Sequence, residues 1–144
     1  MKTSDIAKQA VRLGGRKALE FFTNRDQLNV DVKGPQDYVS EADCRVEAIM
    51  IDFLQSHFPD DGFLGEESSE IKQAKQWVID PIDGTTNFIR GLPYFCTTLA
   101  LVESERVIGG WIFDPTRDEL YEANPGYGAY CNGQRLQPNW RHSF

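Results

Sequence analysis

The sequence predicts an α+β fold in which a pair of N-terminal helices packs on a mainly antiparallel sheet. Three observations support this. Two amphipathic helical segments occupy the first part of the chain, strand-like segments with short polar connections dominate after residue 94, and the regular alternation of strands and helices that builds a parallel sheet is missing from the pattern. The 144 residues suffice for one domain with a buried core.

The first predicted helix covers residues 4–22. Apolar side chains recur there at helical spacing along two neighbouring stripes, which is typical of a helix with one buried face. They are Ile6, Ala7, Ala10, Val11, Leu13, Ala18, Phe21 and Phe22. Gly14 and Gly15 interrupt the stripes, and each costs about 1 kcal/mol of helix propensity relative to alanine. We expect these glycines to mark a close approach of another element.

A short strand is predicted at 28–33, where apolar and polar residues alternate, and a turn at 34–37. The second helix is predicted from Ser40 to about His57. Ser40 followed by Asp43 indicates a capped helix start with an acid in the first turn. The apolar residues that then recur at helical spacing are Val46, Ile49, Met50, Phe53 and Leu54.

Strands are predicted next, with one short helix among them. Residues 63–67 form a short strand that runs into a polar loop, and residues 77–80 form a buried strand. A short helix is predicted to begin within 84–87. These boundaries place polar residues directly after each of the two strands.

The last part of the chain is predicted to be an antiparallel meander. Three strand-like runs between residues 94 and 124 are joined by short polar connections. The dipeptide Asn132-Gly133 predicts a tight turn. A further strand pattern opens at Gln134, and we expect it to have no partner in this sequence.

Composition excludes several classes of function. Because 22 acidic residues face 15 basic ones, the net charge is −7, and no nucleic-acid partner is expected. No segment approaches the ~20 apolar residues of a membrane span, and the first ten residues lack the apolar part of an export signal. Cys44, Cys96 and Cys131 form no CxxC pair and are interpreted as reduced thiols. The expected location is the cytoplasm, without a membrane partner.

Two acidic motifs follow the two central strands. Gly65-Glu66-Glu67 ends the first strand, and the second motif runs from Asp80 to Thr85. Two unit charges ~5 Å apart repel by ~3 kcal/mol at an effective dielectric of ~20, so converging carboxylates need a cation. Magnesium takes hard oxygen ligands and keeps several waters. The motifs therefore favour a magnesium site.

The second motif also suits an anion. Gly84 allows a tight backbone turn, and Thr85 and Thr86 then present hydroxyls and amides at a predicted helix start. Each motif alone has an ordinary interpretation, the first as a solvated loop and the second as a turn in which Asp83 caps a helix. Acids for metal beside amides for phosphate indicate phosphoryl chemistry when taken together.

A nucleophilic aspartate of the haloacid-dehalogenase type is rejected. Those phosphatases carry Asp-x-Asp-Gly-Thr, whereas Pro81 and Ile82 both separate the aspartates here. On a strand, the extra residue turns the second acid to the opposite face.

The motifs resemble those of the inositol monophosphatase family. The similar segments are DYVSEAD at 37–43, GEES at 65–68, WVIDPIDGTTNF at 77–88, GLPYFCTTLALV at 91–102 and the run DPTRDELYEANPGYGAYCNGQRL from 114. The resemblance implies one family domain over residues 1–136 and a non-family tail at 137–144. It also implies the first part of a layered α/β/α/β sandwich whose second α/β layer is missing.

The resemblance implies metal ligands. Asp80 would bridge two Mg²⁺ ions, and the full set is Glu66, Asp80, Asp83 and the backbone carbonyl of Ile82. Glu67 and Lys33 match positions near a weaker third metal, although Lys33 is equally well explained as an exposed strand lysine.

The resemblance also implies residues for catalysis and for phosphate binding. Asp43 and Thr85 would orient a metal-bound water, and the amides of Gly84 and Thr85 would hold the phosphate. For Asp43, the role of an acid in the first turn of a helix stays open beside this one.

The implied function is that of a magnesium-dependent phosphomonoesterase. The expected substrate is inositol monophosphate or a similar small phosphate ester, with histidinol phosphate as an alternative, and intact members are expected to form homodimers. Members continue into a Trp-Asp-x-Ala-Ala-Gly type motif whose aspartate binds the second metal, and nothing here matches it, since Trp140 is followed by Arg141. A truncated, catalytically inactive fragment that at most binds metal or a partner subunit is the alternative.

Overall fold

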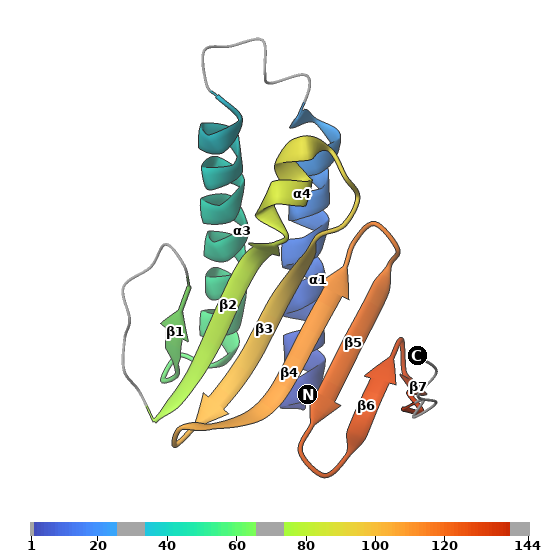
Figure 1. Cartoon of the computed structure of the whole chain (residues 1–144). Helices are drawn as coiled ribbons and strands as arrows, with labels where there is room; N and C mark the ends of the chain where they lie inside the picture. Colours follow the sequence, from blue (N-terminus) through green and yellow to red (C-terminus); the bar gives the residue numbers. More distant parts are fainter. Residues whose placement is uncertain (1, 26–33, 66–73, 139–144) are drawn as a thin grey trace.

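The computed structural model describes residues 2–25, 34–65 and 74–138 (Figure 1). Its helices are α1 (Thr3–Thr23), α3 (Pro35–His57) and α4 (Thr85–Arg90). Its strands are β1 (Gly62–Leu64), β2 (Lys75–Asp83), β3 (Cys96–Glu103), β4 (Arg106–Asp114), β5 (Glu119–Asn124), β6 (Gly128–Cys131) and β7 (Gln134–Arg135).

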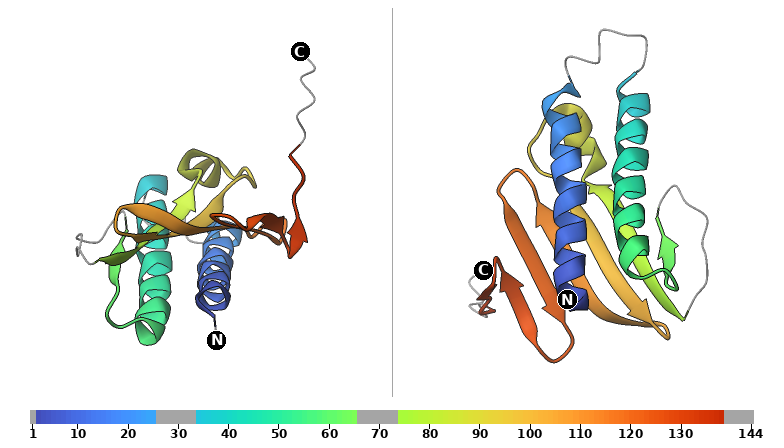
Figure 2. Two further views of the ribbon diagram at one scale, coloured as in Figure 1. Left: turned by 90° about the horizontal axis from the view of Figure 1, so that it is seen from below. Right: turned by 180° about the vertical axis from the view of Figure 1, so that it is seen from behind.

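Within the described residues, the seven strands form one sheet in chain order from β1 to β7. Strand β1 pairs with β2 in parallel, and every other pair is antiparallel. Figure 2 shows α1 and α3 side by side along one face of this sheet, while α4 lies beyond the end of β2. The predicted α+β class, with a helix pair on a mainly antiparallel sheet, is confirmed.

Two adjacent glycines allow α1 to lie close to both of its neighbours. A Cβ atom on Gly14 would lie 2.4 Å from the sulfur of Met50 in α3, and one on Gly15 would lie 2.4 Å from Cδ2 of Phe113 in β4. Neither position accepts a side chain without movement of the core. The predicted close approach is confirmed, and it explains why two poor helix formers occupy the middle of a helix.

The core lies between the helix pair and one face of the sheet. Alternate residues of each strand point toward the helices, as a pleated strand requires. The large apolar residues of β2 to β5 that are buried on this face include Trp77, Ile79, Leu99, Leu101, Trp111, Phe113 and Leu120. The rings of Trp77 and Trp111 have their centroids 5.9 Å apart across this face.

The start of α3 differs from the sequence prediction. The segment predicted as a turn at 34–37 is the beginning of the helix, because Pro35 occupies its first position and Gly34 is the N-cap. Proline suits that position, where its missing N–H would have no helical partner and its φ angle is already helical. Asp43 therefore lies inside the helix, and its interpretation as a first-turn acid is wrong.

The end of the meander also differs. The strand that opens at Gln134 was expected to lack a partner, but it pairs with β6 through Cys131 opposite Gln134 and Tyr130 opposite Arg135. The short β6 escaped prediction because its four residues are too few to show an alternating pattern.

Several predictions lie outside the described residues. These are the strand at 28–33 with Lys33, the residues Glu66 and Glu67, and the part of the tail at 139–144. In the part of the chain that is described, none of the helices has the length and apolar character needed to cross a membrane.

Candidate functional site

The short strand β1 runs parallel to β2 and ends beside the middle of β2. Leu64 at the end of β1 pairs with Val78, two residues before Asp80, so the chain leaves β1 while β2 continues to Asp83. Gly65 follows β1 there, and the segment from Asp80 to Asp83 completes β2. Strand ends of this kind are common ligand sites in α/β and α+β proteins.

A β-bulge shapes the end of β2. Asp80 pairs with Thr98 and Asp83 pairs with Cys96, so four residues of β2 oppose three of β3. Pro81 fits this irregular position because it has no N–H to donate to a neighbouring strand. Its carbonyl accepts a hydrogen bond of 2.8 Å from the buried hydroxyl of Thr97. Bulges often redirect side chains next to active sites, and this one separates the two aspartates.

The bulge leads into a left-handed turn at Gly84. Its φ and ψ are 93° and 40°, a conformation that glycine adopts without steric cost. The first residue of α4 is Thr85, and its hydroxyl donates a 3.2 Å hydrogen bond to the carbonyl oxygen of Ile82. The Ile82 side chain is buried while its carbonyl serves this turn. Asp83 is exposed at the same place.

Two buried carboxylates lie in α3, the helix that packs against β2. Asp43 is 6% exposed and Glu47 is 5% exposed, and their spacing places both on one face of the helix. A Cβ atom on Gly65 would lie 1.2 Å from Oε1 of Glu47, so this carboxylate lies directly at the start of the first acidic motif. Sequence reasoning missed Glu47, although an acid inside the apolar stripe of a helix was a signal for it.

The pKa of the Cys96 thiol is affected by the carboxylates of the site. Its sulfur lies 4.0 Å from Oδ2 of Asp83. Burial raises the pKa of Cys96 to about 11, and the carboxylates of Asp83, Asp80 and Asp114 add to this effect. Three carboxylates therefore act on one thiol. Sequence reasoning also missed Asp114, which is the last residue of β4 as Asp83 is the last residue of β2.

The fold brings some of the predicted site residues together. Asp80, Ile82, Asp83, Gly84 and Thr85 form one continuous turn at the end of β2, and Asp43 lies in the helix that packs against this strand. Glu66, Glu67 and Lys33 lie outside the described residues, so their predicted roles stay predictions.

The atoms at this turn that could bind a metal ion are mainly oxygens. Among residues 2–25, 34–65 and 74–138, no three His, Cys, Asp or Glu side chains converge as a metal site would need. The turn itself offers two carboxylates and the carbonyl of Ile82. Hard oxygen donors of this kind fit Mg²⁺, which commonly keeps waters for its remaining positions.

The amino-acid sequence is similar to those of known proteins over nearly the whole chain. The inositol-1-monophosphatase of Rhizobium meliloti is 43% identical over 143 residues, which cover 97% of this chain and 54% of that protein. The Nus factor SuhB of Escherichia coli K12 is 38% identical over 136 residues, which cover 92% of this chain and 51% of that protein. The chain therefore spans about half the length of these relatives.

The fold agrees with solved structures as well. The crystal structure of the extragenic suppressor protein SuhB from Bartonella henselae superposes with a TM-score of 0.83 at 34% identity, covering 96% of this chain and 54% of that one. The model of the inositol monophosphatase family matches residues 2–143. The predicted end of the family domain at residue 136 remains a prediction. The chain belongs to the inositol monophosphatase family and corresponds to the N-terminal portion of its longer members.

Proposed function

We propose that the chain carries the metal- and phosphate-binding part of a magnesium-dependent phosphomonoesterase. The observation that supports this most directly is the turn from Asp80 to Thr85, where a bulge and a left-handed glycine place two carboxylates, a carbonyl and a hydroxyl at one strand end. Membership of the inositol monophosphatase family supports the same chemistry. The proposed substrate is inositol monophosphate or a similar small phosphate ester, such as histidinol phosphate.

The residues that hold the metal in this proposal are Glu66, Asp80, Asp83 and, through its carbonyl, Ile82. Bound magnesium lowers the pKa of a water ligand and neutralises phosphate oxygens. Glu67 and Lys33 belong to a weaker third metal position in the same proposal.

Asp43 and Thr85 orient the attacking water in this proposal, and the amides of Gly84 and Thr85 hold the phosphate. The hydrogen bond from Thr85 to Ile82 fits this role, because it ties the water-orienting hydroxyl to the residue whose carbonyl holds the metal. Attack on phosphorus is in line with the departing alkoxide.

The rest of the proposal concerns partners and location. It includes a homodimer for full-length relatives, a small-molecule substrate, no nucleic-acid or membrane partner, and a cytoplasmic location. The three cysteines are free thiols, which suits a reducing compartment.

A second candidate is an inactive fragment that binds metal or a partner subunit. It is favoured by one specific observation, namely that the chain spans about half the length of the relatives that it matches. The two candidates agree about the turn at the end of β2 and differ only in turnover.

Phosphate release by the purified chain tests the proposal. A panel of inositol 1-phosphate, histidinol phosphate and other phosphomonoesters would be assayed with Mg²⁺ and with EDTA. Magnesium-dependent release that Asp83→Asn abolishes, and that Asp52→Asn on the exposed side of α3 leaves intact, supports the enzyme. Release that is equal with and without Mg²⁺ refutes it. Metal binding without release supports the second candidate.

A further inference from the structure

The loop between α4 and β3 rests directly on the turn at Gly84. A Cβ atom on Gly84 would lie 2.8 Å from the carbonyl oxygen of Tyr94 and 3.3 Å from the Cα of Phe95. The backbone of Tyr94 and Phe95 therefore lies directly against the backbone of Gly84, and the position of Tyr94 limits the space available to the turn at Gly84. Because Asp83 and Thr85 flank Gly84, their separation depends on this contact.

Helix α4 holds the loop from one side. The side-chain amide of Asn87 donates a 2.9 Å hydrogen bond to the carbonyl of Tyr94, the same oxygen that lies against Gly84. The backbone carbonyl of Asn87 accepts a 2.8 Å hydrogen bond from the amide of Leu92. The loop is thus fastened to the helix that begins at Thr85.

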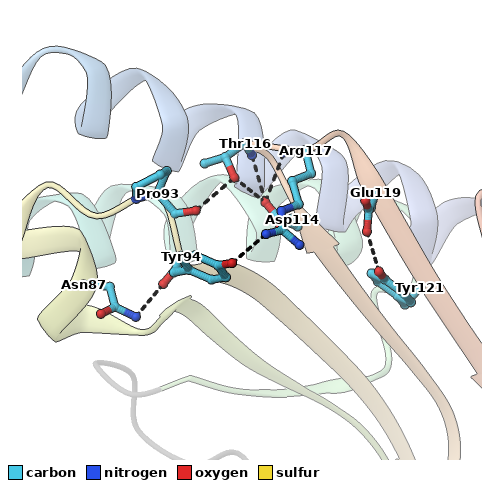
Figure 3. A network of polar contacts seen from close by, with 8 residues as sticks. All are labelled: Asn87, Pro93, Tyr94, Asp114, Thr116, Arg117, Glu119 and Tyr121. Carbon is cyan, nitrogen blue, oxygen red and sulfur yellow. Dashed lines mark hydrogen bonds and ion pairs between the residues drawn. The ribbon is translucent and has the colours of Figure 1, made fainter.

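The connection between β4 and β5 holds the loop from the other side (Figure 3). Nη2 of Arg117 donates a 2.7 Å hydrogen bond to the hydroxyl of Tyr94, and the guanidinium carbon lies 5.0 Å from the centroid of the same ring. The single hydroxyl proton of Thr116 is shared between the carbonyl oxygen of Pro93 at 3.2 Å and Oδ1 of Asp114 at 2.8 Å. Thr116 and Arg117 in the turn between β4 and β5 therefore contact Pro93 and Tyr94 in the loop between α4 and β3.

Asp114 fixes the turn that presents Arg117. Its Oδ1 accepts hydrogen bonds from the amide of Thr116 at 3.0 Å, the hydroxyl of Thr116 at 2.8 Å and the amide of Arg117 at 3.2 Å. Its Oδ2 lies 4.0 Å from Nε of Arg117. The guanidinium is thereby held between a carboxylate and an aromatic ring.

From this series of contacts we infer that Arg117 is a positioning residue for the turn at Gly84. It holds the side chain of Tyr94, whose carbonyl in turn limits the room available to Gly84, and so it maintains the relative placement of Asp83 and Thr85. The consequence for metal binding rests on the proposed function. The mechanical part of the inference rests only on the contacts above.

If Arg117 only stabilised the whole fold, its loss would lower the melting temperature. Tyr94 is 60% exposed and the side chain of Arg117 is 51% exposed. Exposed pairs contribute little to global stability because solvent screens them. Loss of Arg117 should therefore leave the melting temperature close to that of the parent and act mainly on the loop and the turn.

The experiment is amide hydrogen exchange of the full chain, combined with Mn²⁺ titration followed by water-proton relaxation. Arg117→Gln removes the guanidinium, Tyr94→Phe removes the hydroxyl, and Arg117→Lys keeps a cation and a donor. Two matched controls are Arg106→Gln, at the opposite end of β4, and Tyr127→Phe, in the exposed turn between β5 and β6.

In Arg117→Gln, we expect peptides covering residues 84–95 to exchange about 2–5-fold faster, which is the size of effect given by an exposed cation–π contact. The Mn²⁺ dissociation constant should rise by a similar factor, Tyr94→Phe should follow in the same direction, and Arg117→Lys should recover part of the loss. Both controls should behave as the parent.

Unchanged exchange in Arg117→Gln would overturn the inference, and faster exchange with an unchanged Mn²⁺ affinity would overturn its consequence for metal binding. A parent chain that binds no Mn²⁺ would refute the proposed function instead. The exchange comparison would then decide by itself whether Arg117 holds the turn.

Discussion

The hydroxyl of Thr85 donates a hydrogen bond to the backbone carbonyl of Ile82 across 3.2 Å. This bond spans Asp83 and Gly84, so it closes the turn that carries the candidate metal and phosphate groups. The same carbonyl is proposed to hold the metal, and the same hydroxyl is proposed to orient the attacking water. A change at Thr85 can therefore separate catalysis from metal binding.

Thr85→Ala should lower turnover by ~100-fold or more in a full-length family member with the same motif, since a group that positions a proton transfer contributes at least that much. Metal affinity should change little, because the ligands stay in place. Thr85→Ser keeps the hydroxyl and should retain most of the activity. Steady-state kinetics at several Mg²⁺ concentrations would show this. Loss of metal binding with normal turnover at saturating metal would contradict the assignment.

Gly84→Ala should destabilise the fold more than Gly126→Ala. Both glycines have a positive φ, 93° and 84°, so each substitution costs about 1–2 kcal/mol for the left-handed conformation. Only at Gly84 does the new Cβ meet backbone, at 2.8 Å from the Tyr94 carbonyl, whereas nothing lies within 4 Å at Gly126. The additional steric cost should be about 1–3 kcal/mol. Urea unfolding of both variants measures the difference, and equal losses would contradict the close contact.

Cys96 should react slowly with iodoacetamide in metal-free buffer. Because its pKa is raised to about 11, chiefly by burial, about one thiol in a thousand is ionised at pH 8, and only the thiolate reacts. The alkylation rate should keep rising with pH up to about 11. The exposed Cys44 in the same chain serves as the internal reference. Peptide mass spectrometry in EDTA would measure both, and equal rates at pH 8 would show that the pKa of Cys96 is not raised by burial and the neighbouring carboxylates.

The sequence predicted those parts of the fold where periodicity is strong. The stripes of α1 and the alternation along β3 and β4 reflect burial of one face, and burial is directly visible in the order of apolar residues. The start of α3 was missed because glycine and proline mark turns and helix starts alike, and only the observed N-cap at Gly34 distinguishes the two. Asp43 was consequently placed in the first turn of that helix.

The candidate site was predictable where its residues are consecutive. The run from Asp80 to Thr85 is contiguous, so a metal and phosphate site could be predicted from it together with Gly65-Glu66-Glu67, while the individual roles of its residues came from the resemblance to the family. Glu47 reaches Gly65 from helix α3, and Asp114 acts on Cys96 beside Asp83 through the pairing of β3 with β4. Contacts between distant segments leave no local pattern in the sequence, which is why Asp114 escaped prediction. For Glu47, an acid inside the apolar stripe of a helix signalled burial but did not indicate which segment its carboxylate meets.

The most direct test of the central claim is the dependence of unfolding free energy on Mg²⁺. At a free concentration 100 times the dissociation constant, binding to the folded chain alone should add ~2.7 kcal/mol. Asp80→Asn and Asp83→Asn should each lose most of this gain, whereas Asp52→Asn, which removes the same charge from the exposed side of α3, should keep it. If the parent gains no stability from Mg²⁺, or if both site variants gain as much as the parent, the turn at the end of β2 is not a metal site.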